Sequence, residues 1–241
     1  MQKHLQSVNY KFRSKNSKKL YLGTDEIEAV THTKFLGTII DQHSSWEYHI
    51  CQTKKKVAKG LAIISKAKKL LNSRALISLY HSFVYPYFDY CIEVWGSAAK
   101  THINSLFRMQ KKAIRSITMS AFRAESKPLF QKYKFLTLDE IHIYKVALFM
   151  FKVHHNTAPE HFKDYFQNSF KVHEYRTRAR HMLRVPTYKL EIMKMSIRIK
   201  GVYIWNFIHS SLTPNCSPES FKIALNIFLL GNENLDKIIP K

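Results

Sequence analysis

The segment from Trp46 to Leu71 constrains the fold most, because it sets one apolar face against one basic face at the period of an α-helix. Its apolar residues recur at helical spacing, at Ile50, Val57, Leu61, Ile64 and Leu71. The opposite face carries seven lysines with no acidic residue between them: Lys54, Lys55, Lys56, Lys59, Lys66, Lys68 and Lys69. Two interpretations stay open, a solvated helix face and a row of lysines that follows a phosphate backbone.

Two further helices are predicted directly after this one. The first runs from Leu76 to Val94 and contains Pro86, so we expect a kink there. The second runs from about Lys100 to Thr118, and its basic residues line one face at steps of three, four and seven: Arg108, Lys111, Lys112 and Arg115. The sequence thus predicts a second basic helix face, in addition to that of the Trp46–Leu71 segment.

The segment before Trp46 is short, polar and prone to form strands. Strands are expected near Leu20–Gly23, Ile27–Val30 and Lys34–Asp41, and together they could form a three-stranded antiparallel patch. Gly37 suggests a bulge or a close backbone approach. A patch of this size needs a helix packed on it to be stable.

The second half of the chain is also predicted to be helical. Thr137 and Glu140 have the spacing of a capping box, which opens a helix that is apolar nearly all round and ends at about His155. Other helical segments are expected at 128–133, 159–166 and 197–208, with a last helix that starts at Ser217-Pro218 and ends at Gly231. Residues 167–187 are expected to be irregular. The predicted fold class is therefore mainly α, a helical bundle with a small N-terminal antiparallel β patch.

Charge is the strongest property of the whole chain. It contains 39 Lys and Arg against 17 Asp and Glu, a formal net charge of +22 over 241 residues. This excess favours nucleic acid as the partner, although a basic surface that serves solubility or an acidic protein partner stays open. The three cysteines have no paired spacing, which fits a reducing intracellular setting, and no apolar run of about 20 residues predicts a membrane span.

Five motifs follow one another in a fixed order. They are Lys34-Phe-Leu-Gly-Thr-Ile-Ile-Asp41 with Trp46 and His49-Ile50; Tyr85-Pro86-Tyr87 with Tyr90 and Trp95-Gly96; Gln110-Lys-Lys-Ala-Ile-Arg115; His173-Glu-Tyr-Arg-Thr-Arg178; and Ser196-Ile197 with Gly201 and Trp205-Asn206. In this order they resemble the C-terminal region of the reverse transcriptases of non-long-terminal-repeat, LINE-type, jockey-like retrotransposons. The resemblance covers residues 26–230, the end of the polymerase palm, the thumb and the region downstream.

The resemblance implies three parts: residues 1–45 as a remnant of the palm, 46–120 as a thumb-like three-helix bundle, and 121–241 as a C-terminal helical region. A thumb grips the backbone of the template–primer duplex largely without reading sequence. The resemblance therefore implies phosphate contacts by Lys54, Lys55, Lys56, Lys59, Lys66, Lys69, Arg108, Lys111, Lys112 and Arg115. The expected partner is RNA, DNA or an RNA–DNA hybrid, with an intact polymerase in trans as a further candidate.

Two further expectations concern the second half of the chain. Tyr175, Thr177 and Arg178 should form a packed core motif with Trp205. Arg176, Arg178 and Arg180 could add a nucleic-acid contact.

Catalytic residues are missing from this pattern. Polymerases of this class hold two metal ions between carboxylates, including an adjacent Asp-Asp pair, and the sequence contains no such pair. Asp41 matches a family aspartate outside the catalytic set, and Asp89 and Glu93 are expected to pair with basic residues on adjacent helices. The chain is thus expected to be a truncated, non-catalytic element product without a cofactor. A helical interaction module and a relic without function are the alternatives.

The densest group of histidines is His154, His155 and His161. Adjacent residues on a helix point about 100° apart, so neighbouring histidines rarely share one metal ion. No metal site is therefore expected.

Overall fold

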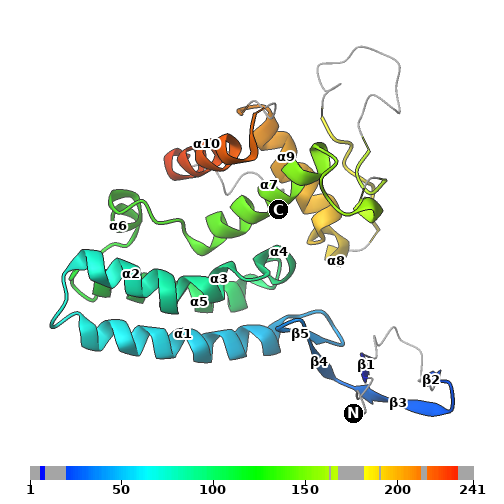
Figure 1. Cartoon of the computed structure of the whole chain (residues 1–241), viewed down its shortest axis with the longest axis horizontal. Helices are drawn as coiled ribbons and strands as arrows, with labels where there is room; N and C mark the ends of the chain where they lie inside the picture. The colour runs from blue at the N-terminus through cyan, green and yellow to red at the C-terminus, as the bar shows by residue number, and fades with distance from the viewer. Residues whose placement is uncertain are drawn as a thin grey trace. The chain divides into compact units, whose positions relative to one another are not determined.

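The chain forms two compact units, and a computed structural model describes residues 6–8, 20–162, 164–167, 182–189, 191–212 and 216–232 (Figure 1). The first unit comprises residues 1–87 and 98–120, and the second comprises 88–97 and 121–241. Helices dominate both units, and the strands of the described residues precede residue 42. The prediction of a mainly α fold with a small N-terminal β patch is confirmed.

The strands form two small sheets. β3 (Asp25–Val30) pairs in parallel with β1 (Gln6–Val8) and antiparallel with β2 (Leu20–Leu22), whereas β4 (His32–Phe35) and β5 (Thr38–Asp41) form a separate hairpin. The predicted single strand over Lys34–Asp41 and the predicted three-stranded antiparallel patch are therefore wrong. Leu36 and Gly37 both have positive φ, 45° and 86°, which turns the chain back on itself in a two-residue hairpin loop. Gly37 marks this turn rather than a bulge.

The first unit contains a bundle of α1 (Glu47–Ala67), α2 (Ser73–Phe83) and α5 (Lys100–Ile117). α1 packs against both other helices, and its most buried side chains include Ile50, Val57 and Ile64. These are positions that the helical period of the sequence assigns to the core. Asn72 starts α2 by accepting a hydrogen bond from the Ala75 amide, 3.0 Å away.

The single kinked helix predicted over Leu76–Val94 is wrong, because the chain breaks twice there. α2 ends at Phe83, followed by α3 (Tyr85–Asp89) and α4 (Ile92–Trp95). Val84, two residues before Pro86, leaves helical geometry with φ −123°, and Cys91 takes the left-handed conformation with φ 52°. A proline removes a backbone donor and obstructs the preceding turn, so the helix stops ahead of it instead of bending.

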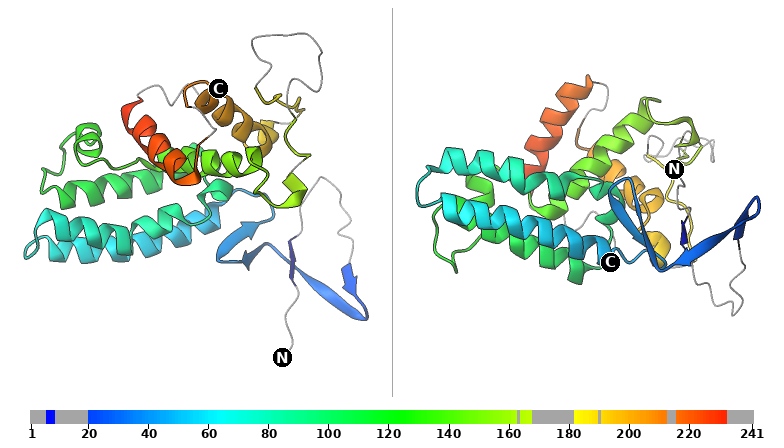
Figure 2. Two further views of the ribbon diagram at one scale, coloured as in Figure 1. Left: turned by 45° about the horizontal axis from the view of Figure 1, so that its top comes forward. Right: turned by 60° about the horizontal axis from the view of Figure 1, so that its bottom comes forward.

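The second unit is built around α7 (Leu138–His154). This helix packs against α4, α9 (Ile197–His209) and α10 (Pro218–Gly231) (Figure 2). The shorter elements of this unit include α6 (Lys127–Lys132), the 3₁₀ helix η1 (Glu160–Phe162) and α8 (Glu191–Lys194). The predicted capping box is confirmed, since Thr137 accepts from the Glu140 amide and Glu140 accepts from the Thr137 amide. The helix predicted over 159–166 is present only as the short 3₁₀ helix η1. The amides of Phe162 and Tyr165 each bond to the carbonyl three residues back, of Pro159 and Phe162.

Candidate nucleic-acid interface

Three lysines of α1 lie directly opposite its buried face. Each helical residue advances by about 100°, so Lys55, Lys59 and Lys66 fall within about 40° of one another around the axis and face away from Val57 and Ile64. All three side chains are exposed. We call Lys55, Lys59 and Lys66 the α1 stripe.

The other lysines near α1 have different surroundings. Lys54 and Lys56 lie on opposite flanks of the helix; Lys54 is half-buried, and the Lys56 ammonium is 5.6 Å from the ring centroid of Tyr87. Lys69 is exposed beyond the end of the helix. The six predicted lysines of this region therefore do not share one face.

α5 carries a similar row of three basic residues. Arg108, Lys112 and Arg115 fall within about 60° of one another, opposite the buried Leu106 and Ala113. Arg108 and Lys112 are exposed and Arg115 is half-buried. We call Arg108, Lys112 and Arg115 the α5 stripe.

Lys111 lies apart from the α5 stripe. Its ammonium is 4.2 Å from the ring centroid of Phe107, one turn earlier on the same helix. This cation–π contact keeps the charge beside an aromatic side chain on the flank of α5.

The two stripes do not merge into one flat surface. α1 and α5 pack against each other through their buried faces, and each stripe lies opposite the buried face of its own helix. Each stripe therefore lies on the outer side of its helix. The structure brings three predicted residues together on each helix, but not all ten.

The bundle has almost no negative charge of its own. Glu47, in the first turn of α1, is the one acidic residue in the sequences of α1, α2 and α5. The sequences of α1, α2 and α5 therefore contain many more basic than acidic residues, a balance that favours anions as ligands.

The motif around Asp41 joins the β4–β5 hairpin to α1. The Asp41 side chain is 3% exposed and accepts hydrogen bonds from the amides of His43, Ser45 and Trp46 at 2.8–3.0 Å. Burial alone would raise the pKa of Asp41, but these hydrogen bonds outweigh burial and hold the pKa below its usual value. Asp41 thus supports the start of α1.

His49 completes the same junction. It is buried in the first turn of α1, and its Nδ1 accepts a hydrogen bond from the Ile39 amide of β5, 3.3 Å away. Burial, followed by the positive charge of Lys56, lowers the pKa of His49, so the neutral acceptor form is favoured. His49 therefore has a structural role: it joins β5 to the first turn of α1.

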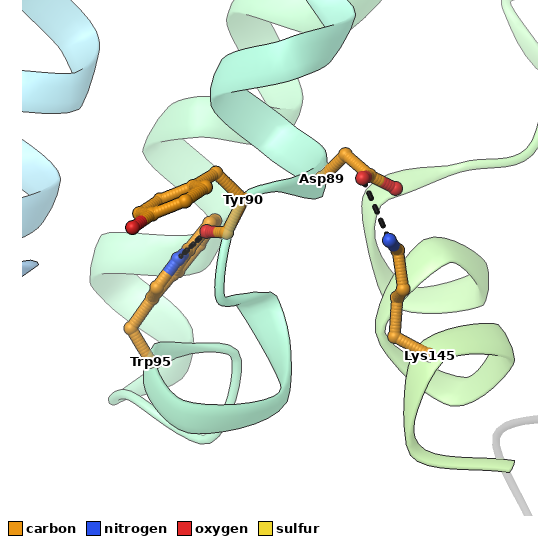
Figure 3. Close-up of polar contacts among 4 residues, drawn as sticks. All are labelled: Asp89, Tyr90, Trp95 and Lys145. Atoms are coloured by element: carbon orange, nitrogen blue, oxygen red, sulfur yellow. Dashed lines mark hydrogen bonds and ion pairs between the residues drawn. The ribbon is translucent and has the colours of Figure 1, made fainter. Parts of the chain in front are cut away.

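The motif that ends in Trp95-Gly96 is also structural. Trp95 is fully buried, and its indole N–H donates to the Tyr90 carbonyl at 2.8 Å (Figure 3). Beside it, Asp89 pairs with Lys145 of α7 at 2.7 Å, which confirms the predicted ion-pair role of Asp89 (Figure 3). A Cβ on Gly96 would lie 2.7 Å from the His142 ring, so glycine allows this close approach.

One packing residue was missed by the sequence interpretation. Gly60 faces the end of α2, where an added Cβ would lie 2.5 Å from the Phe83 carbonyl oxygen. A glycine inside a predicted helix is the signal that could have revealed this close contact.

The histidine-rich region forms a ring cluster. His154 lies 5.9 Å from His209 and 5.3 Å from Trp205 between ring centroids. Across the residues that the structure describes, no three His, Cys, Asp or Glu side chains are arranged to hold a metal ion. The same residues include no helix with the length and hydropathy needed to cross a bilayer.

The fourth motif, residues 173–178, lies entirely outside the described residues. Tyr175, Thr177 and Arg178, together with Arg176 and Arg180, lie outside the described residues. Their expected partner Trp205 is 2% exposed and belongs to the core of the second unit.

Comparison with known proteins gives partial matches to polymerases of mobile elements. The chain is 25% identical over 140 residues to the probable RNA-directed DNA polymerase from transposon X-element of Drosophila melanogaster, which covers 56% of this chain and 15% of that protein. It is 33% identical over 98 residues to the RNA-directed DNA polymerase from mobile element jockey of Drosophila funebris, covering 37% of this chain and 10% of that protein. A third match, at 25% identity over 117 residues, is the probable RNA-directed DNA polymerase from transposon BS of Drosophila melanogaster, covering 47% of this chain and 13% of that protein.

These matches define the class to which the chain is related, the RNA-directed DNA polymerases of non-long-terminal-repeat retrotransposons. Within that class the relatives are jockey, X-element and BS, so the chain contains a jockey-like, reverse-transcriptase-related region. The matched regions span only 10–15% of these three relatives. No family model matches the chain, and no solved structure matches it.

Proposed function

We propose that this chain binds the phosphate backbone of nucleic acid through the α1 and α5 stripes. The proposal rests mainly on the two stripes, each of three basic residues on the outer side of its helix. The sequences of α1, α2 and α5 together contain one acidic residue. Each phosphate contact made by such a row releases counterions, which gives affinity without reading sequence. The relatives are RNA-directed DNA polymerases, so an RNA–DNA hybrid duplex is the favoured ligand.

The arrangement of helices supports a thumb-like role for residues 46–120. In this proposal α1, α2 and α5 form a rigid bundle that presents the stripes, residues 1–45 supply the end of a palm, and residues 121–241 form a C-terminal helical region. Because the two stripes lie on the outer sides of different helices, each would engage a separate stretch of phosphates.

We also propose that the chain binds without catalysing polymerisation. The sequence contains no adjacent Asp-Asp pair. Asp41 matches a family aspartate outside the catalytic set, and its carboxylate accepts hydrogen bonds from backbone amides at the start of α1.

Separate variants of the two stripes test the binding proposal. Lys55→Gln/Lys59→Gln/Lys66→Gln and Arg108→Gln/Lys112→Gln/Arg115→Gln would be compared with the unchanged chain for affinity to an RNA–DNA hybrid across a salt series. Each triple variant should make the dependence of log K on log salt shallower, by roughly 0.9 for each phosphate that the variant no longer neutralises. Unchanged slopes for both variants would contradict binding through the stripes.

A second candidate is binding to a protein partner, including an intact polymerase in trans. The turn of the β4–β5 hairpin exposes 60% of Phe35 and 76% of Leu36, and adjacent exposed apolar side chains favour a protein contact. Phe35→Ser/Leu36→Ser should abolish co-purification with an intact jockey-type polymerase while leaving hybrid binding intact. Co-purification that persists in this variant would exclude the hairpin as the contact.

A further inference from the structure

A small pocket in the second unit gathers two positively charged side chains in its wall. Its volume is about 250 Å³, and two arginines, Arg184 and Arg198, contribute to its wall. Both arginines are exposed, and none of the residues that line the pocket is acidic. Thr187, Ser196 and Gln167 add hydrogen-bonding groups.

The backbone around Arg184 is held on two sides. Asn206 of α9 clamps the preceding residue, Leu183, because its side-chain oxygen accepts from the Leu183 amide and its side-chain nitrogen donates to the Leu183 carbonyl, both at 2.8 Å. The Arg184 amide then donates to the Gln167 carbonyl, also at 2.8 Å. Arg184 therefore starts from a fixed backbone position, and Asn206 acts as a positioning residue.

Arg198 is oriented by a different contact. It lies in the first turn of α9, and its guanidinium carbon is 5.1 Å from the ring centroid of Tyr165. An arginine on an aromatic ring keeps its N–H donors at the edge of the guanidinium plane, where two of them can bind two oxygens of one anion. Nearby, the Ser196 side chain makes no capping hydrogen bond to α9.

We propose that this pocket binds one phosphate group of a nucleic-acid strand, held by Arg184 and Arg198 with help from the hydroxyls of Thr187 and Ser196. Guanidinium groups bind phosphate oxygens through charge-assisted hydrogen bonds, and neutral hydroxyls can donate further ones. A pocket of about 250 Å³ is smaller than the roughly 300–1,000 Å³ of sites that enclose a whole small molecule, so it suits one group of a longer ligand. The choice of nucleic acid as that ligand rests on the proposed function, whereas binding of the phosphate group does not.

The test uses the full chain and three probes. The arginine Nε–Hε signals of Arg184 and Arg198 would be followed by NMR during titration with inorganic phosphate, a short single-stranded oligonucleotide, and the same oligonucleotide with an uncharged methylphosphonate backbone. The affinity of Arg184→Gln/Arg198→Gln for the natural oligonucleotide would be compared with that of Lys152→Gln/Lys222→Gln. This control removes two exposed charges from the second unit that do not line the pocket.

The proposal predicts that the natural oligonucleotide shifts both arginine signals and that the methylphosphonate form does not. The arginine variant should bind at least about tenfold more weakly, and the lysine control should not, because two charge-assisted hydrogen-bonding groups are removed only in the former. Arg184→Lys/Arg198→Lys keeps the charge but removes the planar donor fork, so its affinity should fall between those of the other two.

Three results would overturn the proposal: no response of either arginine to any probe, equal binding of the methylphosphonate strand, or equal affinity of the arginine variant and the lysine control. A response to inorganic phosphate alone would overturn the assignment of nucleic acid. Failure of the pocket is distinct from failure of the stripes, because the stripe variants lie in the first unit and are measured on a hybrid duplex.

Discussion

At the scale of single residues, Asp41 illustrates how a motif can be structural. Its carboxylate accepts hydrogen bonds from three backbone amides where β5 is followed by α1. It also accepts one from the Ser45 hydroxyl, 3.2 Å away. Hydrogen bonds to a charged group are stronger than those between neutral groups, so this cluster stabilises the junction as long as Asp41 is ionised.

Asp41→Asn should lower the free energy of unfolding by about 1–3 kcal/mol at neutral pH, because an amide cannot accept all of these hydrogen bonds. The folded pKa of Asp41 is lowered, so its contribution is present above the unfolded value of about 3.9 and is lost as the pH falls through the folded value. Urea unfolding of the variant and the unchanged chain should therefore differ at pH 7 and converge in acid. The exposed Asp25→Asn is the matched control; a constant difference at all pH values would contradict the role of the ionised carboxylate.

Gly60 gives a second prediction at this scale. Alanine is the better helix former by about 1 kcal/mol, yet its Cβ would lie 2.5 Å from the Phe83 oxygen and 2.8 Å from Val84 Cγ2. Overpacking of this kind costs about 1–3 kcal/mol, so Gly60→Ala should lower the midpoint of thermal unfolding. At Gly231 an added Cβ would meet no atom within 4 Å among the described residues beyond its chain neighbours and helix backbone, so Gly231→Ala should be neutral or stabilising. Equal effects of the two substitutions would show that α1 and α2 do not approach so closely.

At the scale of elements, periodicity and capping signals predicted the helices well. The apolar spacing of α1 and α5 placed Val57, Ile64 and Ile114 in the core, and Thr137 marked the start of α7. These signals depend only on neighbouring residues, so they can be read without knowing the tertiary structure. The breaks at Val84 and Cys91 were missed because helical period alone does not show whether a proline bends a helix or ends it.

The capping box of α7 can be tested as an element. Thr137→Ala removes the hydroxyl that accepts from the Glu140 amide, so the free energy of unfolding should fall by about 1 kcal/mol. Chemical denaturation followed by circular dichroism measures this change. Thr137→Ser keeps the hydroxyl and should stay close to the unchanged chain; a Ser variant as unstable as the Ala variant would argue against capping.

The basic residues show the limit of prediction at this scale. The helical period placed the basic residues on two helices, but their division into a stripe and its flanks depends on which face each helix buries. The pocket of Arg184 and Arg198 was not predicted at all, because it combines segments around residues 165, 184 and 196 whose proximity depends on tertiary contacts such as the Asn206 clamp. No spacing in the sequence reports such a contact.

At the scale of the whole molecule, the order of the motifs indicated the relationship to jockey-like polymerases, and the comparisons confirm it. Several described residues of these motifs have structural roles: Asp41 and His49 build a junction, Trp95 and Gly96 pack in the second unit, and Asn206 clamps Leu183. A chain can keep such packing residues while its surface acquires or loses a function. The proposed binding of nucleic acid therefore depends on surface residues, those of the α1 and α5 stripes.

The affinity of the full chain for an RNA–DNA hybrid across a salt series tests that claim most directly. The test variant changes Lys55, Lys59, Lys66, Arg108, Lys112 and Arg115 to Gln, and a control variant with the same net charge changes six exposed residues of the second unit: Arg123, Lys127, Lys132, Lys134, Lys152 and Lys222. Backbone binding through the stripes predicts a steep salt dependence in the unchanged chain, largely kept in the control and abolished in the stripe variant. If both variants weaken binding equally, net charge alone accounts for the affinity and the α1 and α5 stripes are not the interface.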